Sequence, residues 1–180
     1  MVYLPIMILS FLAMVPFIIV AEKKRKMKPI FLFAITLVAA SQLLMGGLTA
    51  ESKYALFVLL FLYFMAFNLL EASLPSLISK ISPAGQKGAA MGVYSSSQFF
   101  GAFVGGAAGG WLYGEWGIDA VLMACGVLAL IWAAVVLPMA TPKHLTGKAV
   151  ALPEHWSDDT DGFVNRLLAL PGVEEVVVIE

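Results

Sequence analysis

Charged residues are scarce in this sequence. They make up 13% of its 180 residues, whereas apolar residues make up 61%. A soluble domain is typically about one quarter charged and about half apolar. The composition therefore excludes a surface covered mainly by water and predicts that a lipid bilayer covers most of the chain. The net charge of −1 provides no basic field that would attract nucleic acid.

Cysteine and histidine are also rare. The single cysteine, Cys125, cannot form an intrachain disulfide or a CxxC pair. His144 and His155 are isolated, so we expect no metal site and no cofactor. The sequence contains no nucleotide-binding loop and no hydrolytic triad, and a membrane-embedded enzyme would need a cluster of His, Asp or Glu within the spans. We therefore predict that the protein is not an enzyme.

Five long apolar segments are present instead, at about 2–21, 29–49, 54–79, 88–113 and 118–140. Each is close to the roughly 20 residues that a helix needs to cross the hydrocarbon core. Strands are excluded because lipid cannot satisfy an open strand edge, and the segments lack the alternation of barrel strands. Residues 1–141 are therefore predicted to form about five transmembrane helices.

Lysine and arginine are distributed unequally between the connections. Those on one side are Lys23, Lys24, Arg25, Lys26, Lys28, Lys80, Lys87, Lys143 and Lys148, and the other side has Lys53 alone. Cytoplasmic loops carry the excess of basic residues. The pattern predicts a multi-pass protein of the cell membrane with its N-terminus outside and its C-terminus in the cytoplasm. Because this arrangement is unusual for a complete transporter, we expect that the chain lacks its beginning.

The character of the sequence changes after Pro142, and we assign residues 142–180 to a cytoplasmic linker and a partial tail domain. An apolar helical face is expected from Phe163, Val164, Leu167, Leu168 and Leu170. Weak strand patterns precede and follow this helix, at 149–153 and 176–179. The order strand, helix, strand is too short to bury a sizeable core, which indicates a truncated domain.

One ionisable side chain, Glu71, lies well inside a predicted span. A charged carboxylate at the bilayer centre costs at least about 2.5 kcal/mol, so Glu71 is expected to face protein or a water-filled cavity. Asn68 precedes it by one turn and Pro75 follows by one turn, on the same helical face. The functional hypothesis is that Glu71 and Asn68 line a pathway for substrate or protons. The alternative is a structural hydrogen bond near the cytoplasmic end.

The fourth span carries polar residues and a series of glycines. Tyr94 and Gln98 share a face, and they are candidates either for substrate contact or for hydrogen bonds between helices. Small residues four apart allow helix backbones to approach closely in lipid. The glycines with this spacing, to which we assign helix packing or gating, are Gly101, Gly105 and Gly109 together with Gly106 and Gly110. Gln42, in the second span, is interpreted as structural.

The stretch FNLLEASLPSLISKISP and the following GQKGAAMGVYSSSQFFGAFVGGAAGGWL resemble the tenth and eleventh helices of major facilitator superfamily transporters. The nearest resemblance is to the YajR-type group, which are drug:proton antiporter-like proteins. On this alignment the five spans correspond to helices eight to twelve. The tail LLALPGVEEVVVIE resembles part of a ferredoxin-like domain, although the CxxC of its metal-binding versions is absent.

The resemblance implies an all-α membrane protein, a partial major facilitator fold, with a short truncated ferredoxin-like α+β tail. It also implies a proton-coupled secondary transporter of the bacterial inner membrane. The expected partners are the lipid bilayer, a small-molecule substrate, protons and the missing N-terminal helices. The alternative function is a truncated remnant that does not transport, or a membrane assembly subunit.

Overall fold

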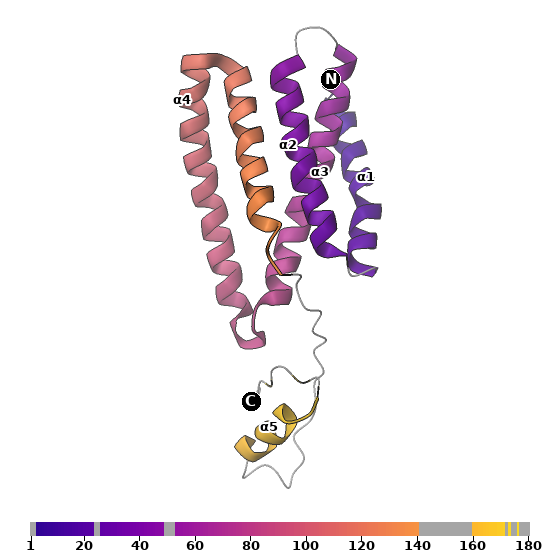
Figure 1. Cartoon of the computed structure of the whole chain (residues 1–180), viewed down its shortest axis with the longest axis vertical. Coiled ribbons are helices and arrows are strands. Elements are labelled where there is room, and N and C mark those ends of the chain that lie inside the picture. Colours follow the sequence, from indigo (N-terminus) through magenta and orange to yellow (C-terminus); the bar gives the residue numbers. More distant parts are fainter. Residues whose placement is uncertain are drawn as a thin grey trace.

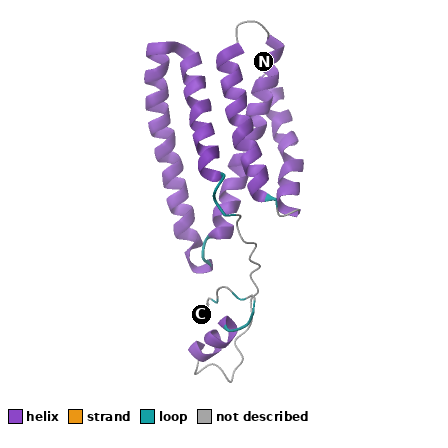
Figure 2. Cartoon of the chain, in the orientation of Figure 1, coloured by secondary structure: helices purple, strands orange, loops and turns teal. Residues whose placement is uncertain are grey.

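The computed structural model describes residues 3–23, 26–48, 53–140, 160–171, 173 and 176. Throughout these residues the regular structure is helical (Figure 2). The long helices are α1 (Tyr3–Lys23), α2 (Met27–Leu48), α3 (Lys53–Ile81) and α4 (Lys87–Val136), and the short 3-10 helix η1 (Ala84–Gln86) joins the last two. These four helices of the described part are long and apolar enough to cross a membrane.

Helix α4 is bent at Gly117. A straight helix of its 50 residues would be about 75 Å long, far more than the roughly 30 Å of hydrocarbon. Gly117 has φ 78° and ψ −173°, a conformation that glycine adopts easily because it has no Cβ. The chain therefore turns back on itself there (Figure 1). We call residues 87–116 the first arm and residues 118–136 the second arm.

The two arms replace the last two spans expected from the sequence. An interruption was predicted between residues 113 and 118, but the helix continues through Trp116 and the break is confined to Gly117. In Figure 1 the first arm rises and the second descends beside it, so the two arms run antiparallel. The structure therefore differs from the prediction only in where the fourth predicted span ends, because Gly117 alone makes the turn.

Helix α2 is central in the bundle and packs against α3 and α4. The core is made by its inner face, with Ala34 and Ile35 completely buried, together with Leu69 of α3 and Ala133 of the second arm. Two serines are also fully buried, and each donates a hydrogen bond to a carbonyl of its own helix: Ser10 to Met7 and Ser41 to Val38. These hydroxyl groups therefore need no partner from a neighbouring helix.

Apolar side chains also cover the outside of the bundle. The first arm is the clearest case, with Phe99, Phe100 and Phe103 exposed by 75%, 69% and 72%. Soluble monomers rarely expose contiguous apolar patches larger than a few hundred Å². This exposed apolar surface is compatible with contact to lipid.

Described cations gather at one end of the bundle, as the charge distribution in the sequence predicted. Figure 1 places the end of α1, the start of α2 and the α3–α4 connection at the same, lower end. Lys80 of α3 forms an ion pair there with Glu22 of α1, with an Nζ–Oε1 distance of 2.5 Å. Lys53, by contrast, begins α3 at the opposite end.

In the tail, the described residues include the predicted helix. Helix α5 (Thr160–Leu168) has Asp161 in its first turn, and Phe163, Val164 and Leu167 on it are half-buried, whereas Leu168 and Leu170 are exposed. The second strand is not seen at Val176, which belongs to no strand. Residues 149–153 and 177–179 lie outside the described residues. The described residues of the tail therefore show a helix and do not show an α+β domain.

The closest packing of α2 against the second arm occurs at Gly126. A Cβ added there would lie 2.6 Å from Leu43 Cγ and 3.3 Å from the Ala39 carbonyl oxygen, whereas a Cβ at Gly105 in the first arm would meet nothing within 4 Å. We therefore predict that Gly126→Ala destabilises the bundle by about 1–3 kcal/mol through overpacking.

The unfolding free energy of the purified chain in mixed detergent micelles measures this effect. Gly105→Ala is the matched control, and we expect it to be neutral or stabilising by up to about 1 kcal/mol, because alanine favours helix. Equal effects of the two substitutions would contradict the close approach at Gly126.

Candidate functional site within the membrane bundle

Glu71 lies on α3, nine residues before Lys80, which is about 13 Å along the helix. Pro75 lies one turn later in the same helix. Proline has no N–H, so it cannot donate the usual backbone hydrogen bond to the carbonyl of Glu71. Glu71 therefore has two hydrogen-bond acceptors that its own helix does not satisfy. One is its side-chain carboxylate, and the other is its backbone carbonyl.

Gln98 of the first arm is the observed partner of Glu71. Its amide Nε2 donates to Glu71 Oε1 at 3.1 Å and lies 3.4 Å from Oε2. Both side chains are exposed on the described bundle, so the pair lies at a surface that other helices or water can reach. The contact connects α3 with the first arm, and it brings together two residues that the sequence analysis had assigned separately.

The other two polar candidates are placed differently. Tyr94, one turn before Gln98, is half-buried and close enough to Glu71 to interact with it electrostatically. Asn68 is half-buried on α3 and is not among the residues that line the hollow next to Glu71. The roles of these residues in a substrate or proton pathway remain predictions.

A hollow of about 300 Å³ adjoins Glu71, between α2, α3 and the second arm. Its lining residues are Val38, Gln42, Tyr63, Phe67, Leu70, Glu71, Leu74 and Trp132. Three of these are aromatic and one is an acid, and no lysine or arginine is found among the described residues that line it. The hollow is thus an apolar and aromatic space with a negative charge at its edge.

Sequence reasoning did not identify Gln42 as part of this site. Its Oε1 atom is buried and has no hydrogen-bond partner among the described residues, although buried side-chain oxygens are nearly always partnered. The assignment of Gln42 as structural leaves that oxygen unexplained. A lone glutamine in an apolar span was the available signal, but its proximity to Glu71 depends on how α2 and α3 pack.

The glycine series of the first arm does not pack against the described helices. A Cβ at Gly101, Gly105, Gly106, Gly109 or Gly110 would meet nothing within 4 Å. Close approach occurs instead at Gly126 and at Gly46, where a Cβ would lie 3.1 Å from Met123 Cγ. A packing or gating role for the first-arm glycines therefore stays a prediction that concerns a helix outside the described part.

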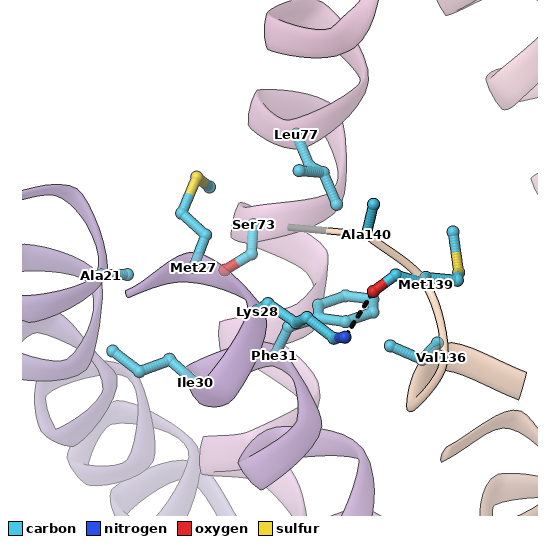
Figure 3. Close-up of a pocket in the computed structure, with 10 residues that line it drawn as sticks. All are labelled: Ala21, Met27, Lys28, Ile30, Phe31, Ser73, Leu77, Val136, Met139 and Ala140. Carbon is cyan, nitrogen blue, oxygen red and sulfur yellow. Dashed lines mark hydrogen bonds between the residues drawn. The ribbon is translucent and has the colours of Figure 1, made fainter. Parts of the chain in front are cut away.

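A smaller hollow of about 70 Å³ lies at the cationic end. Figure 3 shows Lys28 of α2 reaching across it toward the end of α4. Its Nζ donates to the Leu137 carbonyl at 2.8 Å and also to that of Met139. Leu137 is the C-cap of α4 and Met139 lies beyond the helix end, so a lysine there satisfies carbonyls that have no helical partner and is favoured by the helix dipole. We assign this contact to stabilising the bundle end.

The helices and the Glu71 site define a multi-pass membrane protein with a polar pair on the surface of an apolar bundle. Comparison with known families agrees with this class: the family model of the Major Facilitator Superfamily matches residues 3–170. The chain belongs to this superfamily.

Individual relatives are similar over different parts of the chain. The "Inner membrane transport protein YajR" of Escherichia coli (strain K12) is 42% identical over 180 residues, covering 99% of this chain and 39% of that protein. An "Uncharacterized transporter" of Buchnera aphidicola is 35% identical over 85 residues, covering 47% of this chain and 22% of the relative. The chain therefore spans less than half the length of these relatives.

The Glu71–Gln98 contact predicts an energetic coupling between α3 and the first arm. Double-mutant cycles in membrane proteins give about 0.6 kcal/mol for an average interhelical hydrogen bond and up to about 1.7 kcal/mol for the strongest. We expect a coupling in this range between Glu71→Gln and Gln98→Leu, measured as unfolding free energies in detergent.

The control cycle combines Glu71→Gln with Ser97→Ala. The Ser97 hydroxyl donates to the Val93 carbonyl of its own helix at 2.8 Å, and among the described residues it makes no hydrogen bond to Glu71 that the substitution could remove. That cycle should give no coupling. If the Glu71–Gln98 cycle also gave none, the contact would not exist in the folded bundle.

Proposed function

We propose that this chain forms the C-terminal part of a secondary transporter of the inner membrane, which moves small molecules in exchange for protons. Glu71 is the proposed proton-binding group. The observation that carries this proposal is the Glu71–Gln98 hydrogen bond, because it places the intramembrane carboxylate at a junction between two helices. Superfamily membership and the similarity to an inner-membrane transport protein support it.

The two protonation states of Glu71 favour different contacts with Gln98. An ionised carboxylate only accepts hydrogen bonds, so it is satisfied by the Gln98 amide N–H. A protonated carboxyl also carries an O–H donor, and it no longer bears the charge that makes the membrane interior unfavourable. Proton binding therefore weakens the charge-assisted bond that joins α3 to the first arm, which couples protonation to the contact between the two helices.

Alternating access needs more helices than the described bundle has. Substrate sites of such transporters lie near the bilayer midplane between two repeated halves. The first arm has exposed glycines and phenylalanines, and we assign this surface to contact with the further helices of the proposed complete transporter. The proposed complete transporter thus buries this arm and closes the pathway next to Glu71.

The cationic end is proposed to face the cytoplasm, because basic residues accumulate on that side of membrane proteins. The N-terminus of α1 is then outside and α4 ends inside. The tail after α4 is proposed to be part of a small cytoplasmic α+β domain. The half-buried apolar residues of α5 and the resemblance described above support this assignment.

A remnant or an assembly subunit is the competing function. The identity of 42% to the transport protein extends over 99% of the chain, so the match is not confined to a few packing positions. This similarity favours the transporter.

Transport can be tested in a hybrid in which this chain replaces the part of the Escherichia coli relative that it matches. The hybrid is reconstituted in vesicles, and a panel of fluorescent amphipathic dyes is screened for movement against an imposed proton gradient. We expect Glu71→Gln to reduce proton-driven accumulation of a transported dye by at least about tenfold, since removing a proton-accepting group costs catalytic processes about that much or more.

Dye exchange without a proton gradient should continue in the same variant, because glutamine keeps a hydrogen-bonding side chain at this position. Glu115→Gln is the matched control, because it makes the same substitution near the C-terminal end of the first arm, away from Gln98. This variant should transport normally. Undiminished proton coupling in Glu71→Gln would show that Glu71 is not the proton site. A hybrid that transports no dye would contradict the transport proposal.

A further inference from the structure

Two side chains with hydrogen-bond acceptors, Gln42 and Glu71, line the hollow between α2, α3 and the second arm. Gln42 supplies a buried Oε1 without a partner among the described residues, and Glu71 supplies its carboxylate. Pro75 deprives the Glu71 carbonyl of its helical donor. The Gln42 oxygen thus lacks a donor among the described residues, whereas the exposed Glu71 carboxylate accepts from Gln98. Leaving a buried acceptor such as the Gln42 oxygen unsatisfied is costly.

Aromatic side chains form much of the remaining wall. Tyr63 and Phe67 of α3 are stacked, with ring centroids 5.9 Å apart and an interplanar angle of 21°, and Trp132 closes the space from the second arm. Its ring is held by Phe31 of α2 in an edge arrangement, with centroids 5.5 Å apart. Aromatic faces attract cations through their electron-rich π systems, tryptophan most strongly.

We propose that this hollow binds a protonated amine that carries a small apolar or aromatic body. This inference rests on the proposed transport function and specifies its substrate class. The ammonium group supplies both the positive charge that ionised Glu71 requires and the N–H donors that the Gln42 oxygen lacks. The apolar body packs among Leu70, Leu74 and the aromatic rings.

Other ligand classes satisfy fewer of these groups. An anion is repelled by Glu71 and finds no lysine or arginine among the described lining residues. A neutral molecule leaves the charge of Glu71 unbalanced. A quaternary ammonium ion balances the charge and contacts the rings, but it has no N–H to donate to Gln42. The volume of about 300 Å³ lies at the lower end of ligand pockets, which selects compact amines.

The position of Gln42 gives it a role different from that of Glu71. Glu71 lies at the junction with the first arm and binds Gln98, whereas Gln42 belongs to α2 and lines the same hollow from another helix. Glu71 therefore recognises charge, and Gln42 recognises a donor. This division makes Gln42 the residue that distinguishes an amine with N–H groups from a quaternary ion.

Binding can be measured on the full chain in lipid nanodiscs by equilibrium dialysis, with empty nanodiscs subtracted for partition into lipid. The probes are 2-phenylethylammonium, its trimethylated quaternary analogue and the neutral 2-phenylethanol. We expect the primary ammonium to bind best. Gln42→Leu should weaken its binding by about tenfold and leave the quaternary analogue unchanged, because one hydrogen bond to a charged group is lost.

Glu71→Gln should weaken both cations by about tenfold or more, because both lose the charge partner. Ser41→Ala is the matched control next to Gln42, since the Ser41 hydroxyl bonds within its own helix, and it should bind all probes normally. Gln42→Met repeats the test with a side chain of similar length if the leucine variant does not fold.

Equal losses for the primary and quaternary ions in the Gln42 variants would overturn the proposal, as would binding of 2-phenylethanol as tight as that of the amine. Binding no greater than in empty nanodiscs would also overturn it. That outcome leaves the proton role of Glu71 intact, because the vesicle experiment with Glu71→Gln measures proton coupling without reference to amines. Loss of proton coupling with no amine binding would therefore refute the substrate class alone.

Discussion

Hydrocarbon offers no hydrogen-bond partner, and this constraint explains most of the described structure. Helices are favoured because they satisfy their backbone groups internally, and the long segments of the described part are all helical. The buried Ser10 and Ser41 bond to carbonyls of their own helices. Glu71 cannot be satisfied in that way, and its partner Gln98 comes from another helix. The polar contacts between helices are therefore few, and each is informative.

Packing within this bundle depends on shape, because lipid removes most of the hydrophobic drive that joins helices in water. Gly46 and Gly126 allow α2 and the second arm to come close, and α2 also packs against α3. The first arm has glycines in greater number but no described neighbour against them. Glycine thus permits a close helix contact in the second arm, whereas most glycines of the first arm are exposed.

The sequence predicted those features that depend on local composition. The apolar lengths located α1, α2 and α3, and the placement of lysines predicted that Lys26, Lys28 and Lys80 share one end of the bundle. The intramembrane carboxylate was also evident, because one acid in an apolar span is conspicuous. Apolar periodicity predicted α5, whereas the strands expected beside it lie outside the described residues except for Val176, which belongs to no strand.

The pairing of residues from different helices was not predictable in this way. Gln98 and Glu71 are 27 positions apart, and their contact depends on the rotation and separation of two helices. The same is true of Gln42, whose unpartnered oxygen becomes visible only when α2 is packed against α3. The glycine spacing in the first arm predicts a close contact that the described residues do not test, whereas the described close contact is made by Gly126, which has no such series around it.

Membrane crossing with the cationic end inside is the central claim of this account. Single cysteines at Lys26 and Lys53, in a chain where Cys125 is replaced by alanine, test it most directly. Intact cells and inverted membrane vesicles are treated with a thiol reagent that cannot cross the bilayer. The account predicts labelling of position 53 in cells and of position 26 in inverted vesicles. Labelling of both positions from the same side would contradict it.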